Sequence, residues 1–226
     1  IYRLRSRAMA RARYDSRTAL LIAVTAALPY LASLTFGFAY DDIHQIVENE
    51  SVTARECGAH DLIGQLGKAT FPGDLYRPLT VLSYRLTFCA LGSDPFPYHL
   101  TNVLLHATAS VLVYLLASRT FSRSASALAA ILFGWQAVHV EAVANVSGRP
   151  ELLAAVFGLS GVLLLLGALE RASAVRAWGA GIFGLAAMLS KESAVLLVVL
   201  APLMCRSLAR GGSDDEAPPT AETGKR

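Results

Sequence analysis

The stretch that decides the fold is the apolar run TALLIAVTAALPYLASLTFGF, residues 18–38, which is followed closely by Tyr40-Asp41-Asp42. A run of about 20 apolar residues is long enough to cross a bilayer as a helix. Pro29 should kink this helix, which lipid-embedded helices tolerate. Two adjacent acids at the exit of a membrane span are costly to place there, so Asp41 and Asp42 are the first candidates for a functional site.

The composition of the chain also indicates an integral membrane protein. Of its 226 residues, 54% are hydrophobic and only 16% are charged, whereas a soluble domain carries about 25% charged residues. Arginines crowd residues 1–17, which we interpret as a cytoplasmic anchor ahead of the first span and not as a nucleic-acid-binding surface. The first apolar run ends without a small-residue cleavage site, so we expect a retained span and not a signal peptide.

Further apolar segments predict a membrane domain over residues 18–206 with about six spans. The later spans are expected at residues 98–116, 124–143, 152–169, 177–189 and 193–205. Lys191 and Glu192 separate the last two runs, which could instead form one long helix with both charges inside it. Six crossings from a cytoplasmic N-terminus leave most Lys and Arg residues inside, whereas merging the last pair would move Arg206 and Arg210 outside. We therefore prefer six spans.

Two segments are expected outside the membrane. Residues 39–97 form a long lumenal loop, in which the apolar residues 79–91 are too short to span and should lie as a helix at the interface. Residues 207–226 are rich in Gly, Pro and acidic residues, which is typical of a disordered tail, here cytoplasmic.

The cysteines and glycosylation sequons carry weaker signals. The three cysteines have no metal-ligand spacing, and their odd number is not typical of a disulfide framework, although a Cys57–Cys89 bridge outside the membrane stays open. Asn49-Glu50-Ser51 and Asn145-Val146-Ser147 match the N-glycosylation sequon. Asn49 is the plausible acceptor if the outside is the lumen of the endoplasmic reticulum, because Asn145 should lie too close to the membrane.

The six-span topology places several polar residues on the lumenal side together with the acid pair. An Asp there can take a proton from an acceptor hydroxyl or help to hold a divalent cation, but Asp41 and Asp42 could also be a solvated helix end. His139 and Glu141 are two residues apart, so they share no helix face and offer no metal pair of their own. A lone His in a span is more often a hydrogen-bond partner between helices than a ligand.

Three cations on the same side could meet an anion. Arg149 lies at a lumenal turn and offers a bidentate phosphate contact, or it reaches toward lipid headgroups. Lys191 could neutralise a phosphate with Glu192 setting its position, or these charges could serve as an internal ion pair that holds the bundle together. Arg77 could likewise serve an anion or a headgroup.

Six short strings make the chain resemble a known family. In order, they are Tyr40-Asp41-Asp42, Tyr76-Arg77-Pro78-Leu79-Thr80, Asn102-Val103-Leu104-Leu105-His106, His139-Val140-Glu141-Ala142-Val143, Ser147-Gly148-Arg149 and Leu189-Ser190-Lys191-Glu192. Each is weak alone, but together they resemble the N-terminal membrane part of the transmembrane and TPR-repeat family of O-mannosyltransferases, over about residues 39–200.

The resemblance implies an all-α membrane protein with a partial GT-C-like multi-span bundle in the endoplasmic reticulum. The implied reaction moves mannose from dolichyl-phosphate mannose to Ser or Thr hydroxyls of a lumenal protein, within membrane lipid and without nucleic acid. The implied roles are a catalytic base at Asp41 and support or metal contact at Asp42. Charge and side of the membrane make Arg149, Lys191 and Arg77 the candidates for contacts to the lipid phosphate. His139, Glu141 and Glu192 are the candidates for supporting roles. No cofactor beyond a divalent cation is suggested, and the identity of that metal is open.

A second hypothesis comes from another class of protein. No 34-residue repeat pattern follows the membrane segments in this sequence. The alternative is therefore a non-catalytic membrane adaptor, or an inactive fragment of the same fold. A transporter is the weakest option, because the sequence shows no inverted repeat.

Overall fold

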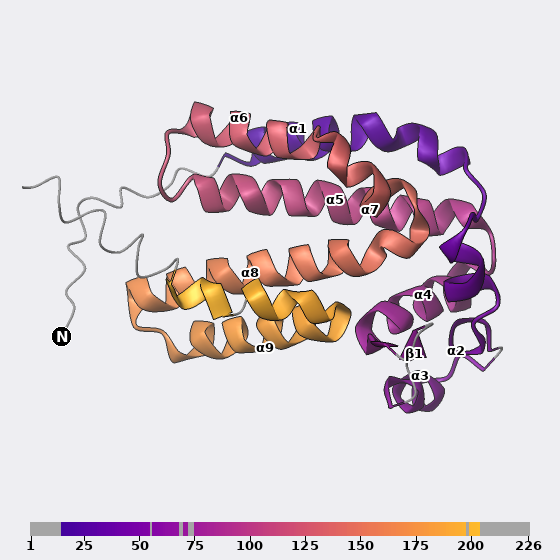
Figure 1. Cartoon of the computed structure of the whole chain (residues 1–226). Helices are drawn as coiled ribbons and strands as arrows, with labels where there is room; N and C mark the ends of the chain where they lie inside the picture. The colour runs from indigo at the N-terminus through magenta and orange to yellow at the C-terminus, as the bar shows by residue number, and fades with distance from the viewer. Residues whose placement is uncertain (1–14, 55, 68–69, 72–74, 198, 204–226) are drawn as a thin grey trace, which may run out of the picture.

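The described part of the chain is built from helices and one small hairpin, and it is shown as a computed structural model in Figure 1. The structure describes residues 15–54, 56–67, 70–71, 75–197 and 199–203. Most of the basic segment 1–17 and the whole tail 207–226 lie outside the described residues.

The first apolar run forms two kinds of helix. α1 (Ser16–Ala27) begins at Asp15, whose side chain accepts a hydrogen bond from the Arg17 backbone N–H at 3.2 Å. It continues as the 3₁₀ helix η1 (Leu28–Thr35), which has Pro29 in its first turn. Proline lacks an N–H and clashes with the preceding turn of an α-helix, so the tighter 3₁₀ winding begins where Pro29 enters.

The loop after the first span is largely structured. Its elements are the π-helix η2 (Ile43–Val47), α2 (Glu50–Thr53), α3 (Ala59–Leu66), the antiparallel pair β1 (Thr70–Phe71) and β2 (Leu75–Tyr76), and α4 (Pro78–Leu91). A disulfide joins Cys57 to Cys89 on α4, with their Cα atoms 5.7 Å apart, so the bridge that the sequence left open is present. One turn earlier on α4, buried Arg85 donates to the carbonyl oxygens of Ser51, at 3.1 Å, and Glu56. This loop is therefore fastened to α4 by a covalent and a polar contact on the same helix face.

The remaining helices form the membrane bundle. They are α5 (Pro95–Ala117), α6 (Arg123–Gly134), η3 (Ala137–His139), α7 (Val140–Ala144), η4 (Val146–Gly148), α8 (Arg149–Arg171), α9 (Ala174–Ser190) and η5 (Glu192–Ala194). α5 packs against α1, α6 and α8, and α8 packs along α9. Large apolar side chains such as Leu20, Leu128 and Ile182 point outward from the bundle, as expected for helices that face lipid.

Among the described residues, three helices are long and apolar enough to cross a membrane: Ser16–Thr35, Pro95–Ala117 and Val146–Arg171. A fourth crossing is formed if α6 and the following Ala137–Ala144 segment, which are bent by 47°, count as one broken span. Ala174–Ser190 and Glu192–Leu203 are shorter apolar helices. The chain is thus an all-α membrane protein, while six crossings remain a prediction.

The last two apolar runs do not join into one helix. α9 ends at Ser190, Lys191 is extended with φ −154° and ψ 132°, and the chain starts again at Glu192. The final helix then runs back beside α9, as the change from orange to yellow in Figure 1 shows. The alternative of a single long helix with both charges inside it is therefore wrong, because the backbone breaks at Lys191.

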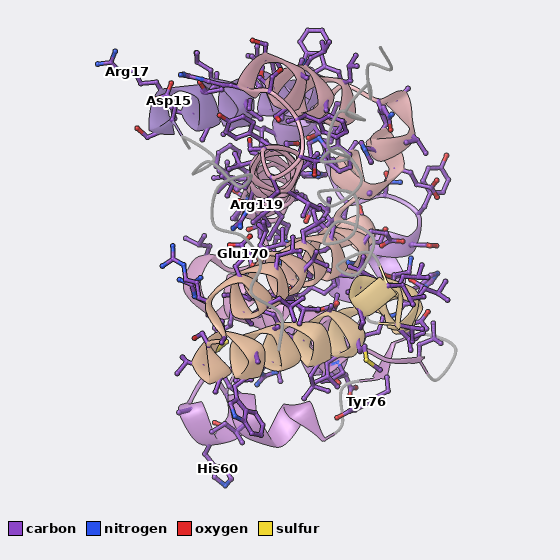
Figure 2. All side chains as sticks on the ribbon, turned by 90° about the vertical axis from the view of Figure 1, so that its left-hand side faces the viewer. Asp15, Arg17, His60, Tyr76, Arg119 and Glu170 are labelled. Carbon is purple, nitrogen blue, oxygen red and sulfur yellow. A yellow bond between two sulfur atoms is a disulfide. The ribbon has the colours of Figure 1, made fainter. Side chains whose placement is uncertain are left out.

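The two ends of the bundle differ. One end carries the loop elements η2 to α4, the turn between α7 and α8, and the turn at Lys191; we call it the loop end (Figure 1). The opposite end holds the α5–α6 and α8–α9 connections, where Arg119 pairs with Glu170 at 2.6 Å and Arg123 pairs with Asp15. Figure 2 views the molecule from this opposite end, with Arg119 and Glu170 labelled beside each other.

Candidate functional site

The two neighbouring acids at the loop end have different surroundings. Asp42 is only 1% exposed, and its carboxylate accepts hydrogen bonds from the backbone N–H groups of Ser147, at 2.7 Å, and Ala39, at 3.2 Å. Asp41 is exposed. The turn that separates them from η1 passes through Tyr40, whose φ of 49° lies in the left-handed region. Asp42 thus fixes this turn against the start of α8, and Asp41 presents its carboxylate to solvent.

The turn that receives Asp42 is tightly packed. A Cβ atom on Gly148 would lie 2.4 Å from the carbonyl oxygen of Ala142, so only glycine fits where α7 meets η4. Tyr84 donates to the carbonyl oxygen of Val146 at 2.8 Å, and the Asn102 amide donates to that of Asn145 at 2.9 Å. α4 and α5 therefore hold the backbone on which the Asp42 contact depends.

Arg149 lies inside the bundle and is fully buried. Its guanidinium donates to Asn102 Oδ1 at 3.0 Å and to the Tyr98 carbonyl oxygen at 3.1 Å, and it lies 4.5 Å from the ring centre of Tyr84. Longer contacts reach the hydroxyls of Ser83 and Thr87, at 3.4 and 3.3 Å. Every guanidinium nitrogen has an internal acceptor, so a phosphate contact would require Arg149 to leave these partners.

The other two predicted cations meet carboxylates at the loop end. Arg77, just before α4, holds Glu192 through two hydrogen bonds, Nε to Oε2 at 2.9 Å and Nη2 to Oε1 at 2.6 Å. Lys191 pairs with Glu151 in the first turn of α8. The hydroxyl of Thr80 donates to the Ser190 carbonyl oxygen at 2.9 Å and ties this turn to α4.

The electrostatics of this pairing keep Glu192 charged. The hydrogen bond from Arg77, followed by the residue's own backbone N–H, lowers the pKa of Glu192 to about 2. Between them, α4, α8 and the turn after α9 bring two cations and two acids together. Beside them is a cavity of about 210 Å³, whose lining includes Glu151, Lys191, Ala154, Ala194 and Leu197.

His139 and Glu141 lie on a different part of the structure. His139, in η3, is half-buried, and its ring centre is 4.5 Å from that of Phe133 and 5.2 Å from that of His106. His106 itself lies 3.1 Å, through Nε2, from the Gly134 carbonyl oxygen. Glu141 is exposed in the first turn of α7. These residues line the break between α6 and α7, and the ring contacts of His139 with Phe133 and His106 are packing contacts.

No three His, Cys, Asp or Glu side chains of the described residues gather closely enough to hold a metal ion. Both oxygens of Asp42 already accept backbone N–H groups. The described residues around the acid pair therefore do not form a preorganised binding site for a divalent cation.

The sequence reasoning missed three residues that shape this region. Glu151 is the partner of Lys191, and Tyr84 and Asn102 hold the turn before Arg149. Asn102 is recognised in the sequence only as the first residue of the string Asn102-Val103-Leu104-Leu105-His106, with no role of its own. Glu151 could have been found as an acid in a first helical turn, where the helix dipole favours it.

Comparison with known proteins places these features in a family. The sequence pattern of the family described as dolichyl-phosphate-mannose-protein mannosyltransferase matches residues 77–210. The protein O-mannosyl-transferase Tmtc1 of Drosophila melanogaster is 37% identical over 199 residues, which cover 82% of this chain and 22% of the relative. TMTC3 of Mus musculus is 38% identical over 149 residues, with 64% and 16% covered. TMTC2 of Mus musculus is 32% identical over 189 residues, with 76% and 22% covered.

The chain spans about a fifth of the length of these curated relatives. No solved structure matches it. The family pattern covers more than half of the chain and includes three parts of the loop end, namely α4, Arg149 and the Lys191 turn; η2 to β2 precede the matched range. On this evidence the chain belongs to the dolichyl-phosphate-mannose-protein mannosyltransferase family.

Proposed function

We propose that this chain provides the acid site and the phosphate-facing cations of an enzyme that moves mannose from dolichyl-phosphate mannose to Ser or Thr hydroxyls of lumenal proteins. Membership of the family and the names of its relatives, which are protein O-mannosyl-transferases, support this reaction. The observation that carries the residue assignment is that an exposed Asp41 lies at the same end of the bundle as Arg77 and Lys191.

In the proposed mechanism, Asp41 acts as the general base. Its carboxylate takes the proton of the acceptor hydroxyl while the hydroxyl oxygen attacks the anomeric carbon of mannose. The bond between that carbon and the phosphate oxygen breaks, and the bonding pair leaves with the lipid phosphate. Cations held near the departing oxygen stabilise the negative charge that develops on it. We assign this role to Lys191 and Arg77.

The remaining residues position these groups. Asp42 holds the turn that carries Asp41, because its carboxylate joins the chain after η1 to the backbone before α8. Arg149 packs the starts of α8 and α5 together behind the site. His139 and Glu141 support the break between α6 and α7. Glu192 has its supporting role in the free protein, where it holds the guanidinium of Arg77. Each step of the proposed mechanism is assigned to one of these side chains, and none is assigned to a metal ion.

We further propose that the protein lies in the membrane of the endoplasmic reticulum, with the N-terminus in the cytoplasm and the loop end in the lumen. The Cys57–Cys89 disulfide at the loop end supports this orientation, because disulfides form and persist in oxidising compartments such as that lumen. The proposed partners are dolichyl-phosphate mannose, a lumenal acceptor protein and membrane lipid, and nucleic acid is not among them.

Replacement of the proposed base tests this function. In microsomes that contain the full-length protein, Asp41→Asn should lower mannose transfer from dolichyl-phosphate mannose to an acceptor protein by about 10²–10⁴-fold, because the hydroxyl loses its base. Asp61→Asn makes the same chemical change on α3 of the loop and should leave transfer unchanged. Expression and membrane insertion, followed by immunoblot, should be equal for both variants.

Normal transfer by Asp41→Asn would exclude the proposed base. The adaptor hypothesis predicts a different pattern: the unmodified protein would transfer no mannose, and changes at Asp41 would not alter the partners that it recruits.

A further inference from the structure

Two ion pairs lie next to each other at the loop end. Arg77 holds both carboxylate oxygens of Glu192, at 2.6 and 2.9 Å, and Lys191 pairs with Glu151. Lys191 and Glu192 are consecutive residues in the turn between α9 and the final helix, so the two pairs share one short piece of backbone. They join the start of α4, the start of α8 and this turn.

In both pairs the cation is the inner partner and the acid is the outer one. The Arg77 side chain is 12% exposed and that of Glu192 is 57% exposed. The Lys191 side chain is 22% exposed and that of Glu151 is 45% exposed. An anion that approaches from outside therefore meets the carboxylates first, and it reaches the cations only if the carboxylates give up their places.

The donors in the first pair suit a phosphate as well as a carboxylate. A guanidinium presents parallel N–H groups that bind either group in a bidentate manner. The same two donors cannot serve both anions at once, so the carboxylate and a phosphate exclude each other at Arg77. Ion pairs with one well-exposed partner contribute little to stability, so exchange of one anion for another is inexpensive.

The adjoining cavity adds an apolar component. Its volume is about 210 Å³, and Ala154, Ala194 and Leu197 form its wall beside Lys191 and Glu151. Pockets that enclose a whole drug-sized molecule measure about 300–1,000 Å³. This cavity therefore fits a segment of a larger amphiphile, with the charged part at Lys191 and the apolar part against the alanines and leucine.

We propose that Glu192 and Glu151 are place-holders, which occupy in the free protein the positions that phosphate oxygens of the lipid donor take when it binds. The incoming phosphate replaces the two carboxylates at Arg77 and Lys191, and the carboxylates turn outward into water. This inference rests on the proposed function for the identity of the ligand. It adds that the two acids compete with the donor and do not help to bind it.

Affinity measurements on the full-length protein in lipid nanodiscs test this exchange. The probe is a fluorescent short-chain dolichyl phosphate, and the variants are Glu192→Gln and Glu151→Gln. Each should bind the probe about three- to fivefold more tightly than the unmodified protein, because one competing carboxylate is gone. Glu192→Asp retains the charge and should tighten binding less than Glu192→Gln.

Glu170→Gln is the matched control, because Glu170 pairs with Arg119 at 2.6 Å at the opposite end of the bundle. Its affinity for the probe should equal that of the unmodified protein. Fluorescent dolichol, which lacks the phosphate, should bind all variants alike. Inorganic phosphate should displace the probe only at far higher concentration than unlabelled dolichyl phosphate does.

Unchanged or weaker binding of dolichyl phosphate by Glu192→Gln and Glu151→Gln would overturn the inference, since the acids would then be positioning groups. Equal tightening for dolichol, or displacement by inorganic phosphate and dolichyl phosphate at the same concentration, would overturn it as well. If Glu192→Gln loses its thermal unfolding transition, Glu151→Gln decides. A separate transfer assay tests the proposed function. If the unmodified protein transfers no mannose but the two variants bind the probe more tightly, the proposed function is wrong and the place-holder inference stands. If mannose is transferred but the affinities do not change, the proposed function stands and the place-holder inference is wrong.

Discussion

The carboxylate of Asp42 accepts hydrogen bonds from two backbone N–H groups, one of them from Ser147, 105 residues further along the chain. Asp41, its neighbour, is exposed. Burial of a side chain is set by whatever packs against it, so adjacent residues of the same type can differ completely. The residue types alone give no reason to prefer Asp41 or Asp42 as the catalytic base, and only the family resemblance favours Asp41.

Arg149 provides the sharpest test at the residue scale, because its guanidinium is fully buried and bonded to Asn102 and Tyr98. Arg149→Lys should lower the free energy of unfolding by roughly 2–4 kcal/mol, since an ammonium cannot reach several fixed acceptors at once. Thermal unfolding in detergent measures this. Arg119→Lys, at a partly exposed pair, should change it by less than about 1 kcal/mol.

The phosphate role predicted for Arg149 from sequence leads to another result. In that case Arg149→Lys would weaken binding of dolichyl phosphate while the unfolding midpoint stayed the same. The two measurements on one variant therefore separate packing from ligand contact.

Glu192 should make the folding stability depend on pH, because the hydrogen bond from Arg77 lowers its pKa to about 2 from an ordinary value near 4.5. A carboxylate with a lowered pKa contributes stability above its unfolded-state value and loses that contribution as the pH falls toward the folded-state value. The difference in unfolding midpoint between the unmodified protein and Glu192→Gln should therefore be constant from pH 5 to pH 8. It should shrink between pH 4.5 and pH 2, and a change near neutral pH would contradict the Arg77 pairing.

The helices are where sequence reasoning and structure agree best. The expected spans at 98–116 and 152–169 correspond to α5 (Pro95–Ala117) and α8 (Arg149–Arg171), because long apolar runs leave the backbone few alternatives in lipid. The break between α6 and α7 was not foreseen. It is stabilised by contacts from the first span: Trp135 donates to the Thr25 carbonyl oxygen at 2.9 Å, and Tyr30 reaches that of Gln136 at 3.4 Å. The local pattern of apolar residues cannot predict contacts between residues that lie so far apart in the sequence.

The fastening of the loop onto α4 yields a prediction at the scale of this element. Cys57 and Cys89 should resist alkylation by a maleimide in microsomes opened with mild detergent, and both should react after treatment with a dithiol reductant. Labelling of Cys57 and Cys89 without reductant, read by mass spectrometry, would contradict the bridge.

For the whole molecule, the orientation in the membrane determines what each end can meet. The described residues provide three spans, or four with the broken α6–α7 pair, and two shorter helices that reverse at Lys191. The Arg77–Glu192 and Lys191–Glu151 pairs lie at the loop end, whereas the six-span topology stays a prediction. Composition and positive charge predict which side of a membrane an end faces, but they do not decide which side chains touch there.

The sequon at Asn49 tests this orientation. Asn49 uses one N–H of its amide, bonded to the Gln45 carbonyl oxygen at 3.1 Å, and the amide has a second N–H that a glycan can replace. If the loop end is lumenal, the protein should shift in mobility on treatment with an N-glycanase, and Asn49→Gln should abolish the shift. Asn145→Gln should leave it in place, because Asn145, although exposed, lies directly before η4 and α8 and is therefore expected to be too close to the membrane for glycan transfer. A shift that survives Asn49→Gln but not Asn145→Gln would contradict this account.

The hydrogen bond between Asp42 and Ser147 also determines when, during translation, the acid pair can reach its final arrangement. A ribosome adds about 5–20 residues per second, so the partner of Asp42 is made roughly 5–20 s after Asp42 itself. Throughout that interval the Asp42 carboxylate cannot accept the hydrogen bond from the Ser147 backbone N–H, because Ser147 has not been synthesised. The acid pair therefore reaches its final arrangement only when the translocating chain has delivered the turn before α8, and a nascent protein cannot carry a finished site any earlier.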